Sequence, residues 1–560
     1  MSAASADLVF VNGSVLTVDP VFTVASALAV TGGLVSAVGD RAQVMAQAGP
    51  GTRVIDLRGG TLLPGINDTH LHACSFGLTR PPLALDLAGP AVRSLADAAE
   101  AVRTATLRTP AGGWITGHGW DLSRLRECAA DPARLPTRYD LDPVAPGHPV
   151  VLFSGCGRAA WANSAALRRA GIDRNTPAPP GSGLLTDEAG EPTGLLRDDA
   201  RAAVERALPP LTPRLRADAI RAALGTLARL GITSFTEPAL GPGGDTLMRG
   251  ALATATLDTY RRLLVDGELT ARVSVLLLPA GRAGTAAEFI RILDGTELPR
   301  TPDFRRLDVI GVNIFAGGDG PDGPPPAHER CPAGGPGPLP AGATGAERAA
   351  GVAEMIRHAH AAGYQAAVHV TGDHDLDTVV DAFAAADAAH SRPEARHYVL
   401  PGDRLTARGL KRLAEAGLGI GLNPTAAWTA AGRQEVAPGW FCPDAGDAGV
   451  TVISGSDAPA AFPDWRQGLA AMLRCGPGAG GRPGGPEHRD RLEAALRTYT
   501  TDAAWQDFAE DWKGSLEVGK AADLCVLGGD LLGADPDRIT GLPVLFTAVG
   551  GAVVHDELSV

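Results

Sequence analysis

Two histidines spaced two residues apart are the sharpest chemical signal in the sequence. They are His70 and His72, which end the run Thr61-Leu-Leu-Pro-Gly-Ile-Asn-Asp-Thr-His-Leu-His. Because side chains two residues apart on a strand point the same way, both imidazoles can reach one metal ion. A pair with this spacing also arises by chance, so the prediction of a metal site depends on further residues that converge on it.

Two later segments carry residue types that could complete such a site. His369 ends one strand-like run, and Asp457 follows directly after another. Taken alone, His369 fits a core residue and Asp457 fits a helix cap. If both runs are strands of one barrel, however, their carboxyl ends meet at the face where barrel active sites lie. We therefore predict a metal site formed by His70, His72, His369 and Asp457.

The part of the chain that must position these residues alternates strand-like runs with Ala-, Arg- and Leu-rich helical runs. This alternation is typical of a parallel sheet, and eight such units predict the α/β class with a (β/α)8 TIM-type barrel. The histidine pair, His369 and Asp457 fall at the ends of the first, fifth and eighth predicted strands. The eight predicted strands are 61–70, 232–236, 272–277, 309–315, 366–370, 396–400, 418–422 and 451–454.

The two chain ends have a different texture from the barrel segment. Residues 1–60 and 511–560 contain short runs of alternating apolar and polar residues between Gly-rich turns, which predict antiparallel strands. We expect both ends to form one small β-sandwich, a composite domain into which the barrel domain of residues 61–510 is inserted. Residues 86–215 are too many for one helix, so they predict a cap-like insertion after the first strand. The Gly- and Pro-rich residues 316–345 predict a long loop.

Composition limits the possible partners and the location. A chain of 560 residues, 45% of them apolar, can bury a large core or two cores. The net charge of −13 argues against a nucleic-acid partner, and no apolar run is long enough to span a membrane. The seven cysteines form no CxxC pair, and the first residues lack a secretory signal. We expect a cytoplasmic protein with a small-molecule partner.

The chain resembles the metal-dependent amidohydrolase superfamily, and within it amidohydrolase family 3, the N-substituted formamide deformylase-like group. The resemblance covers nearly the whole length, and its motifs are specific for the family and much less so for the substrate. Besides the histidine-pair segment, it rests on Gly117-His-Gly-Trp-Asp121, Trp161-Ala-Asn-Ser-Ala-Ala-Leu167, Gly231-Ile-Thr-Ser, Gly267-Glu-Leu-Thr-Ala-Arg-Val273, His369-Val-Thr-Gly-Asp, Gly455-Ser-Asp-Ala-Pro and Gly514-Ser-Leu-Glu-Val-Gly-Lys-Ala-Ala-Asp-Leu.

The resemblance implies a hydrolase of a non-peptide C–N bond in an amide or formamide-like small molecule. His70, His72 and His369 would hold one divalent ion as neutral imidazoles, with Zn²⁺ expected before other metals. The ion would lower the pKa of a bound water toward roughly 7 and polarise the scissile carbonyl. Asp457 would complete the ligand set and carry a proton from the water to the leaving amine. Family members often form dimers through their barrels, which implies a homodimer.

The fourth predicted strand departs from the family's usual pattern. The family usually carries a lysine there that becomes carbamylated and bridges two metals, but Gly311-Val-Asn-Ile-Phe places Asn313 at that position. No lysine elsewhere can substitute for it: the chain's three lysines are Lys411, which follows the sixth strand, and Lys513 and Lys520, which lie in the C-terminal return. A lysine-bridged two-metal centre is therefore excluded.

Two more positions differ from the usual pattern. Pro401 stands where the sixth strand normally ends in a ligand histidine, and His397 lies about 13 Å further down an extended strand. Arg158, in the insertion, stands where relatives often carry histidine, and its fixed charge could bind a carboxylate or stabilise an oxyanion. The predicted substrate-binding residues are Trp120, Asp121, Arg158, Trp161 and Asn313.

Two functions therefore remain open. The first is a one-metal hydrolase, which the four retained metal-site residues favour. The second is a catalytically reduced or non-hydrolytic barrel that binds a small molecule, as the replacements at Asn313 and Pro401 suggest. Among the other polar residues, Glu237 follows the second strand and is assigned no role beyond facing the barrel mouth. His358 and His360 are predicted on the exposed side of a helix.

Overall fold

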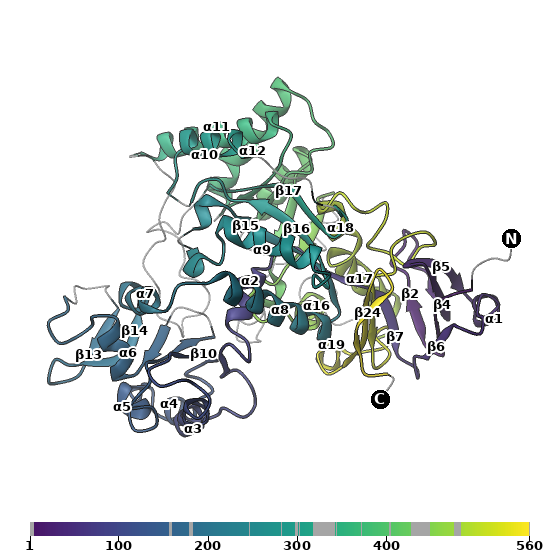
Figure 1. The fold of residues 1–560 in the computed structure, drawn as a ribbon. Helices are drawn as coiled ribbons and strands as arrows, with labels where there is room; N and C mark the ends of the chain where they lie inside the picture. The colour runs from purple at the N-terminus through teal and green to yellow at the C-terminus, as the bar shows by residue number, and fades with distance from the viewer. Residues whose placement is uncertain are drawn as a thin grey trace.

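The computed structural model shows an elongated molecule with a central barrel between two smaller units (Figure 1). The chain ends form the unit on one side of the barrel, and the insertion after the first strand forms the unit on the other side. The residues that the structure describes are 5–155, 159–177, 183–245, 247–281, 283–296, 301, 303–316, 342, 344–370, 372–402, 405–426, 449–474 and 483–558.

An eight-stranded parallel sheet forms the barrel, which confirms the predicted TIM-type fold. Hydrogen bonds from Thr69 N to Ser454 O (3.2 Å) and from Asp457 N to His70 O (2.8 Å) join its first and last strands. In sheet order the strands are β8 (Ile66–Asp68), β15 (Ile232–Leu240), β16 (Arg272–Leu277), β17 (Leu307–Phe315), β18 (Gln365–His369), β19 (Tyr398–Leu400), β20 (Gly419–Leu422) and β21 (Val452–Ser454).

The first predicted strand, residues 61–70, is divided between two sheets, so its prediction as one barrel strand was wrong. β7 (Thr61–Pro64) pairs with strands of the chain-end sandwich, and only β8 joins the barrel. The change occurs at Gly65, where an added Cβ would lie 2.2 Å from the side chain of Thr233. The apolar run continues through both strands, so hydrophobic periodicity could not reveal the division.

Both chain ends contribute to two facing sheets, which confirms the predicted sandwich (Figure 1). The rings of Phe10 and Phe546, from opposite ends of the chain, meet edge to face at 5.4 Å in its core. One sheet contains β1 (Leu8–Val11), β4 (Ala27–Thr31), β5 (Leu34–Gly39) and β6 (Arg53–Asp56). The other contains β2 (Ser14–Leu16), β3 (Val24–Ala25), β7, β22 (Leu524–Leu527), β23 (Val544–Val549) and β24 (Ala552–Asp556).

The insertion has its own six-stranded mixed sheet and its own buried core. Its predicted role as a cap over the barrel mouth stays a prediction. Its strands are β9 (Leu85–Asp86), β10 (Ile115–Trp120), β11 (Val150–Ser154), β12 (Ala159–Ala162), β13 (Leu184–Thr186) and β14 (Pro192–Arg197). Its helices are α3 (Leu95–Thr106), α4 (Arg126–Ala130), α5 (Arg138–Leu141), α6 (Ser164–Arg169) and α7 (Asp198–Ala207).

Helices surround the barrel, and none of the described ones has the length and apolarity that a membrane crossing requires. Of the predicted loop 316–345, residues 317–341 and 343 lie outside the described part of the chain. The larger helices are α8 (Pro213–Arg229), α9 (Thr254–Val265), α10 (Ala286–Asp294), α11 (Gly345–Ala361), α12 (Asp373–Ala389), α13 (Ala407–Glu415), α16 (Trp465–Arg474) and α17 (Pro486–Thr498). The shorter ones are α1 (Arg41–Met45), α2 (Ala73–Leu78), α18 (Thr501–Gln506) and α19 (Pro536–Ile539).

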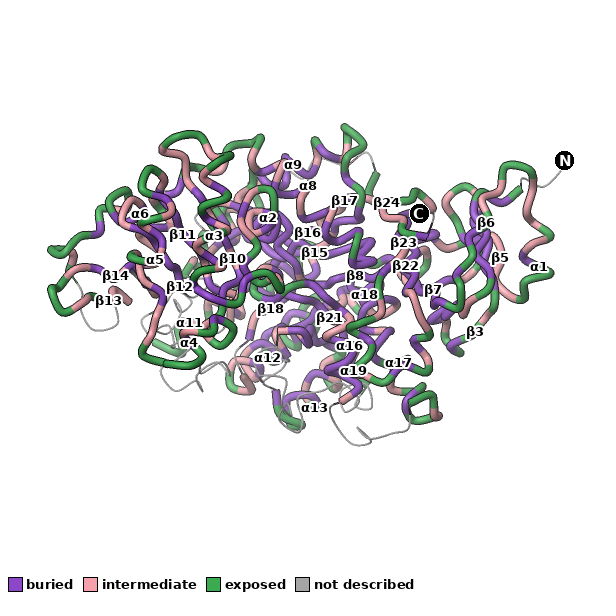
Figure 2. Tube along the Cα trace, turned by 90° about the horizontal axis from the view of Figure 1, so that it is seen from below, coloured by how far each residue is buried: buried purple, intermediate pink, exposed green. Residues whose placement is uncertain are grey.

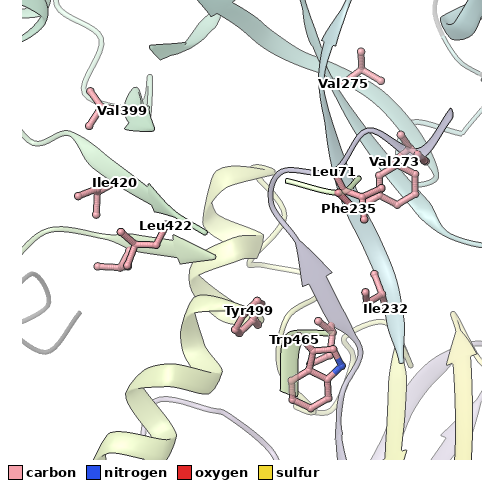
Figure 3. Close-up of a cluster of buried hydrophobic side chains, with 14 of the residues drawn as sticks. Leu71, Ile232, Phe235, Val273, Val275, Val399, Ile420, Leu422, Trp465 and Tyr499 are labelled. Atoms are coloured by element: carbon pink, nitrogen blue, oxygen red, sulfur yellow. The ribbon is translucent and has the colours of Figure 1, made fainter. Parts of the chain in front are cut away.

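Alternation along the strands separates an outer core from the barrel interior. Phe235, Val273 and Ile420 belong to the large cluster that the helices cover, part of which Figure 3 shows. The tube in Figure 2 shows the same buried strands at the centre of the molecule. A second cluster, which contains Leu276 and Ala367 from the alternate positions, fills the interior. Residues that share the interior parity at the strand ends therefore face the barrel axis.

Candidate metal centre

Three of the four predicted metal ligands meet at the carboxyl end of the barrel. His70 and His72 follow β8, and Leu71 between them is fully buried in the outer core (Figure 3). Alternation along an extended segment therefore turns both imidazoles the other way. The segment after β21 pairs with this stretch: His72 N donates to Ala458 O at 2.9 Å, and Asp457 N donates to His70 O at 2.8 Å. The two segments therefore hold the three side chains together.

The distances among the three side chains fit one tetrahedral metal ion. Asp457 Oδ1 lies 3.5 Å from His70 Nε2 and 3.7 Å from His72 Nε2. The ligand atoms of all three residues lie within 4.8 Å of one another. In a tetrahedral zinc site with bonds of about 2.1 Å, neighbouring ligand atoms are about 3.4 Å apart. The residues present therefore fit a divalent ion bound between the two Nε2 atoms and the carboxylate.

The backbone that carries Asp457 is constrained. Asp457 has a φ of 55°, in the left-handed region that non-glycine residues rarely adopt and that often marks functional positions. At Gly455, an added Cβ would lie 2.7 Å from His70 N, so only glycine permits this approach. Asp68 Oδ1 accepts hydrogen bonds from Ser456 N (2.9 Å) and His70 N (3.2 Å), and burial raises the pKa of Asp68 to about 7.

The environment moves the pKa values of the two histidines in opposite directions. For His70, burial and then the charges of His72 and His369 lower the pKa well below its usual value. For His72, burial also acts to lower the pKa, but contact with Glu237 and the charges of nearby carboxylates outweigh it and raise the pKa. His70 is therefore the neutral imidazole of the two over a wide pH range.

His369, the fourth predicted ligand, lies near this group but not within it. It ends β18, where Ala367 faces the barrel interior, so the same parity turns His369 inward. Its ring packs against Phe315 with centroids 5.5 Å apart. The 4.8 Å group nevertheless contains His70, His72 and Asp457 alone among the residues that the structure describes. A role for His369 as a ligand stays a prediction.

Glu237 is a site residue to which the sequence assigned no role. Its side chain is fully buried within β15, where Glu237 pairs with Val275 just before the register shift, and its Oε1 lies 3.3 Å from His72 Nδ1. Its Oε2 accepts hydrogen bonds from Ala73 N (3.0 Å) and Tyr260 Oη (2.8 Å). One signal could have found it: a glutamate in an otherwise uncharged strand needs polar partners when that strand is buried.

Two of the predicted substrate-binding residues lie in the core of the insertion. Trp120 is 3% exposed and Trp161 is fully buried, with their rings edge to face at 6.5 Å. Trp120 Nε1 donates to Leu152 O at 2.8 Å, and Trp161 Nε1 donates to Thr137 O at 2.7 Å. Both indoles therefore pack inside the insertion, with no appreciable surface left for a substrate.

The other three predicted substrate-binding residues differ in their placement. Asp121 is exposed, and its Oδ1 accepts hydrogen bonds from the backbone and side chain of Ser123, as in a turn. Asn313 is 4% exposed on β17, and its Oδ1 has no hydrogen-bond partner among the described residues. Arg158 lies outside the described residues. Of the five, Asn313 is the one that the structure places in the barrel wall.

No lysine lies at the metal centre, and all three lysines of the chain are in its described part. Lys513 enters the barrel from the opposite, amino end, where its Nζ lies 2.5 Å from Asp507 Oδ2 and 3.2 Å from Ser234 Oγ. Lys411 and Lys520 pair with carboxylates on their own local segments. The structure thus agrees with the exclusion of a lysine-bridged centre.

A small cavity elsewhere is separate from this group. It has a volume of about 100 Å³ and lies between α9, α10 and the ends of β15 and β16, outside the barrel. Leu257, Leu278 and Ile292 are among its lining residues, and none of the candidate metal ligands is. This cavity therefore contributes no group to the candidate metal centre.

A parallel barrel with two histidines and an aspartate grouped at its carboxyl end has the layout of a metal-dependent hydrolase. The amidohydrolase family model matches residues 53–555, and the chain belongs to this family. The predicted relationship is thus confirmed, and the match covers the barrel, the insertion and the part of the sandwich from β6 onward.

Individual relatives agree with this assignment. The chain is 27% identical over 563 residues to the N-substituted formamide deformylase of Arthrobacter pascens, and the match covers 98% of each chain. Among solved structures, a metal-dependent hydrolase from Pyrococcus furiosus has a TM-score of 0.65 at 24% identity, over 94% of this chain and 99% of that one. An adenosine deaminase from Xanthomonas campestris with bound zinc has a TM-score of 0.51 at 13% identity, over 99% and 94%. These structures share the fold.

Proposed function

We propose that the protein hydrolyses a non-peptide C–N bond in an amide or formamide-like small molecule, with one divalent ion, zinc before others. The observation that carries this proposal is the grouping of His70, His72 and Asp457 at distances that fit a tetrahedral ion. The similarity to N-substituted formamide deformylase over the whole chain supports the class of substrate. The zinc in the adenosine deaminase of the same fold supports the choice of metal.

His70, His72 and Asp457 would hold the ion, with His369 as the proposed fourth ligand. A divalent ion bound there supplies an acidified water and polarises the substrate carbonyl. Asp457 is the most exposed of the three grouped side chains, at 36% against 13% for His70 and 8% for His72. This exposure lets its carboxylate accept a proton from the attacking water and donate it to the leaving amine.

Two residues of the barrel support the proposal of one ion rather than two. Asn313 stands at the position of the family's bridging lysine, and an amide cannot form a carbamate bridge. Lys513 is held by Asp507 at the other end of the barrel. The same replacement at Asn313, together with Pro401, supports the second candidate, a barrel that binds a small molecule without hydrolysing it. Metal content and turnover distinguish the two.

The test is the metal content of the purified protein by elemental mass spectrometry, beside turnover of N-substituted formamides and amides. We expect about one ion per chain, lost in His70→Ala and retained in His358→Ala, a control that removes a histidine outside the site. Two ions per chain would overturn the one-ion centre. If the protein binds no ion after incubation with zinc, or binds an ion but turns over no amide, the hydrolase proposal fails. The second candidate, a barrel that binds a small molecule, then remains.

The partners and the location belong to the same proposal. It requires a small-molecule substrate and no nucleic acid or membrane. The homodimer and the cytoplasmic location stay predictions, and light scattering of the purified protein and fractionation of the source cells test them.

A further inference from the structure

Glu237 and Asp457 lie against opposite nitrogens of the His72 ring. Nε2 of His72 lies 3.7 Å from Asp457 Oδ1, and Nδ1 lies 3.3 Å from Glu237 Oε1. Neither Nδ1 nor Oε1 has a hydrogen-bond partner of regular geometry among the described residues, so this 3.3 Å approach is the polar contact that each atom has there. The contact with Glu237 is therefore the one available to Nδ1 in this part of the structure, and it lies on the side away from the proposed ion.

The Glu237 carboxylate is held in place by donors from two different helices. Ala73, the first residue of α2, donates its backbone N–H to Oε2, and Tyr260 of α9 donates its hydroxyl to the same oxygen. Glu237 and Tyr260 are both fully buried. Since Oε2 is occupied by two donors, the carboxylate cannot turn freely, and Oε1 remains directed toward His72.

The charge of Glu237 has no arginine or lysine partner in the described residues. An ionised carboxylate without a positive partner is unfavourable in a buried position. His72 and an ion bound to it are the positive groups that this position can use. Burial therefore couples the carboxylate to the metal centre rather than to a separate structural ion pair.

We infer that Glu237 is a positioning residue of the proposed metal centre, and this inference rests on the proposed function. Glu237 accepts the Nδ1–H of His72, which fixes the proton on Nδ1 and leaves the Nε2 lone pair for the ion. Hydrogen bonds of this kind orient a ligand histidine and raise its basicity. Tyr260 acts one step further back, because its hydroxyl holds the carboxylate.

The two histidines of the pair are not equivalent in this arrangement. Neither Nδ1 atom makes a hydrogen bond of regular geometry among the described residues, but His72 Nδ1 has the Glu237 carboxylate 3.3 Å away, whereas no carboxylate contact of His70 Nδ1 is found in this part of the chain. The orientation of His72 is thus set before metal binding, and that of His70 depends more on the backbone around Gly455. The same spacing in the sequence therefore supplies two ligands that are held in different ways.

Equilibrium zinc affinity of the purified full chain, measured by competition with a chromogenic chelator, tests this inference. We expect Glu237→Gln to weaken zinc binding about 10- to 100-fold. We expect Tyr260→Phe to weaken it by a smaller factor in the same direction, because the carboxylate remains but loses one donor. Asp507→Asn is the matched control, since Asp507 is also a buried, hydrogen-bonded carboxylate but lies at the other end of the barrel.

Asp507→Asn should lower the thermal midpoint and leave zinc affinity within about twofold. A visible spectrum of the Co²⁺-loaded protein gives a second readout, which should change in Glu237→Gln and stay unchanged in Asp507→Asn. Wild-type affinity in both Glu237→Gln and Tyr260→Phe would overturn the inference while leaving the proposed function intact. If wild type binds no zinc or cobalt, the proposed function and this inference both fail. If Glu237→Gln does not fold, Tyr260→Phe decides.

Discussion

A pair of histidines lies at each end of the barrel, and the surroundings of the two pairs differ. At the carboxyl end, the Nε2 atoms of His70 and His72 both face Asp457 across a gap that fits a metal ion. At the amino end, His360 and His397 bond to each other, with Nδ1 of His360 2.9 Å from Nε2 of His397. We call His70 and His72 the open pair and His360 and His397 the closed pair. The two pairs share residue type but differ in the partners of their ring nitrogens.

At the amino end every ring nitrogen has a hydrogen-bond partner. Ala366 N–H donates to His397 Nδ1 at 2.9 Å, so the proton of His397 must be on Nε2, from which it donates to His360 Nδ1. His360 then carries its proton on Nε2 and donates to His390 O at 2.6 Å. Both rings are neutral and no lone pair is left for a metal. The difference teaches that the partners of the ring nitrogens, rather than residue type, separate the proposed ligand histidines from structural ones.

The largest expected effect comes from changing the open pair and its aspartate. His72→Gln should remove most of the bound metal, and Asp457→Asn should lower kcat by about 10²- to 10⁴-fold through loss of the proton carrier. His397→Gln should leave metal content and kcat close to wild type, because that histidine has no lone pair available. Metal analysis and steady-state kinetics of the three variants measure this. Loss of metal in His397→Gln would remove the distinction between the pairs.

The closed pair predicts how stability depends on pH. Burial, followed by the charges of His360 and Arg392, lowers the pKa of His397 to about 3. The unfolded chain then binds a proton near its ordinary pKa and the folded chain does not, so stability falls as the pH drops from about 6.5 toward 3 and is level above 6.5. The contribution is about 1.4 kcal/mol per pH unit within that window.

Thermal midpoints of wild type and His397→Gln between pH 5 and 8 measure this contribution. The slope below pH 6.5 should be smaller in the variant, even if the variant is less stable at every pH. His70 also has a lowered pKa and adds its own share to the slope in the metal-free protein. Equal slopes in the two proteins would show that His397 titrates normally and that the pair is not closed.

Substitution of Asn313 tests whether the substrate contacts the barrel wall near the candidate metal centre. Its Oδ1 is buried and has no hydrogen-bond partner among the described residues, so a substrate amide could donate to it. Asn313→Ala should raise KM about 3- to 10-fold, the value of one neutral hydrogen bond, with metal content unchanged. Initial rates over a range of substrate concentrations measure this. A change in kcat alone would place Asn313 against the reacting atoms instead.

The open pair could be predicted from the sequence because its information is local. The spacing of His70 and His72 and their place after a strand indicate two side chains on one face. Asp457 was predicted at the same site only because it follows the eighth predicted strand of the barrel. Glu237 and Tyr260 could not be found this way, because the contacts of Glu237 with His72 and with Tyr260 depend on how a strand and a helix pack. Residues that position a proposed metal ligand without binding the metal have no fixed spacing from that ligand in the sequence.

For the closed pair, the sequence-based prediction was wrong about burial. His358 and His360 were both predicted on the exposed face of a helix, but His360 is 2% exposed and only the prediction for His358, which pairs with Asp294, agrees with the structure. Side chains two positions apart in an α-helix point in directions that differ by about 200°, so His358 and His360 cannot both face solvent. The barrel count succeeded because eight strands repeat one pattern, whereas the division of residues 61–70 between two sheets has no such pattern.

The smallest expected effect concerns the ring that covers the closed pair. Phe383, on α12, stacks on His397 with centroids 4.5 Å apart and an interplanar angle of 23°. Phe383→Leu keeps most of the apolar volume and loses the stacking, worth about 0.5–1.5 kcal/mol, so the thermal midpoint should fall by only a few degrees. Zinc affinity should not change, since the amino end shares no ligand with the metal centre. A weaker zinc affinity in this variant would mean that packing couples the two ends of the barrel. The two histidine pairs would then not be independent of each other.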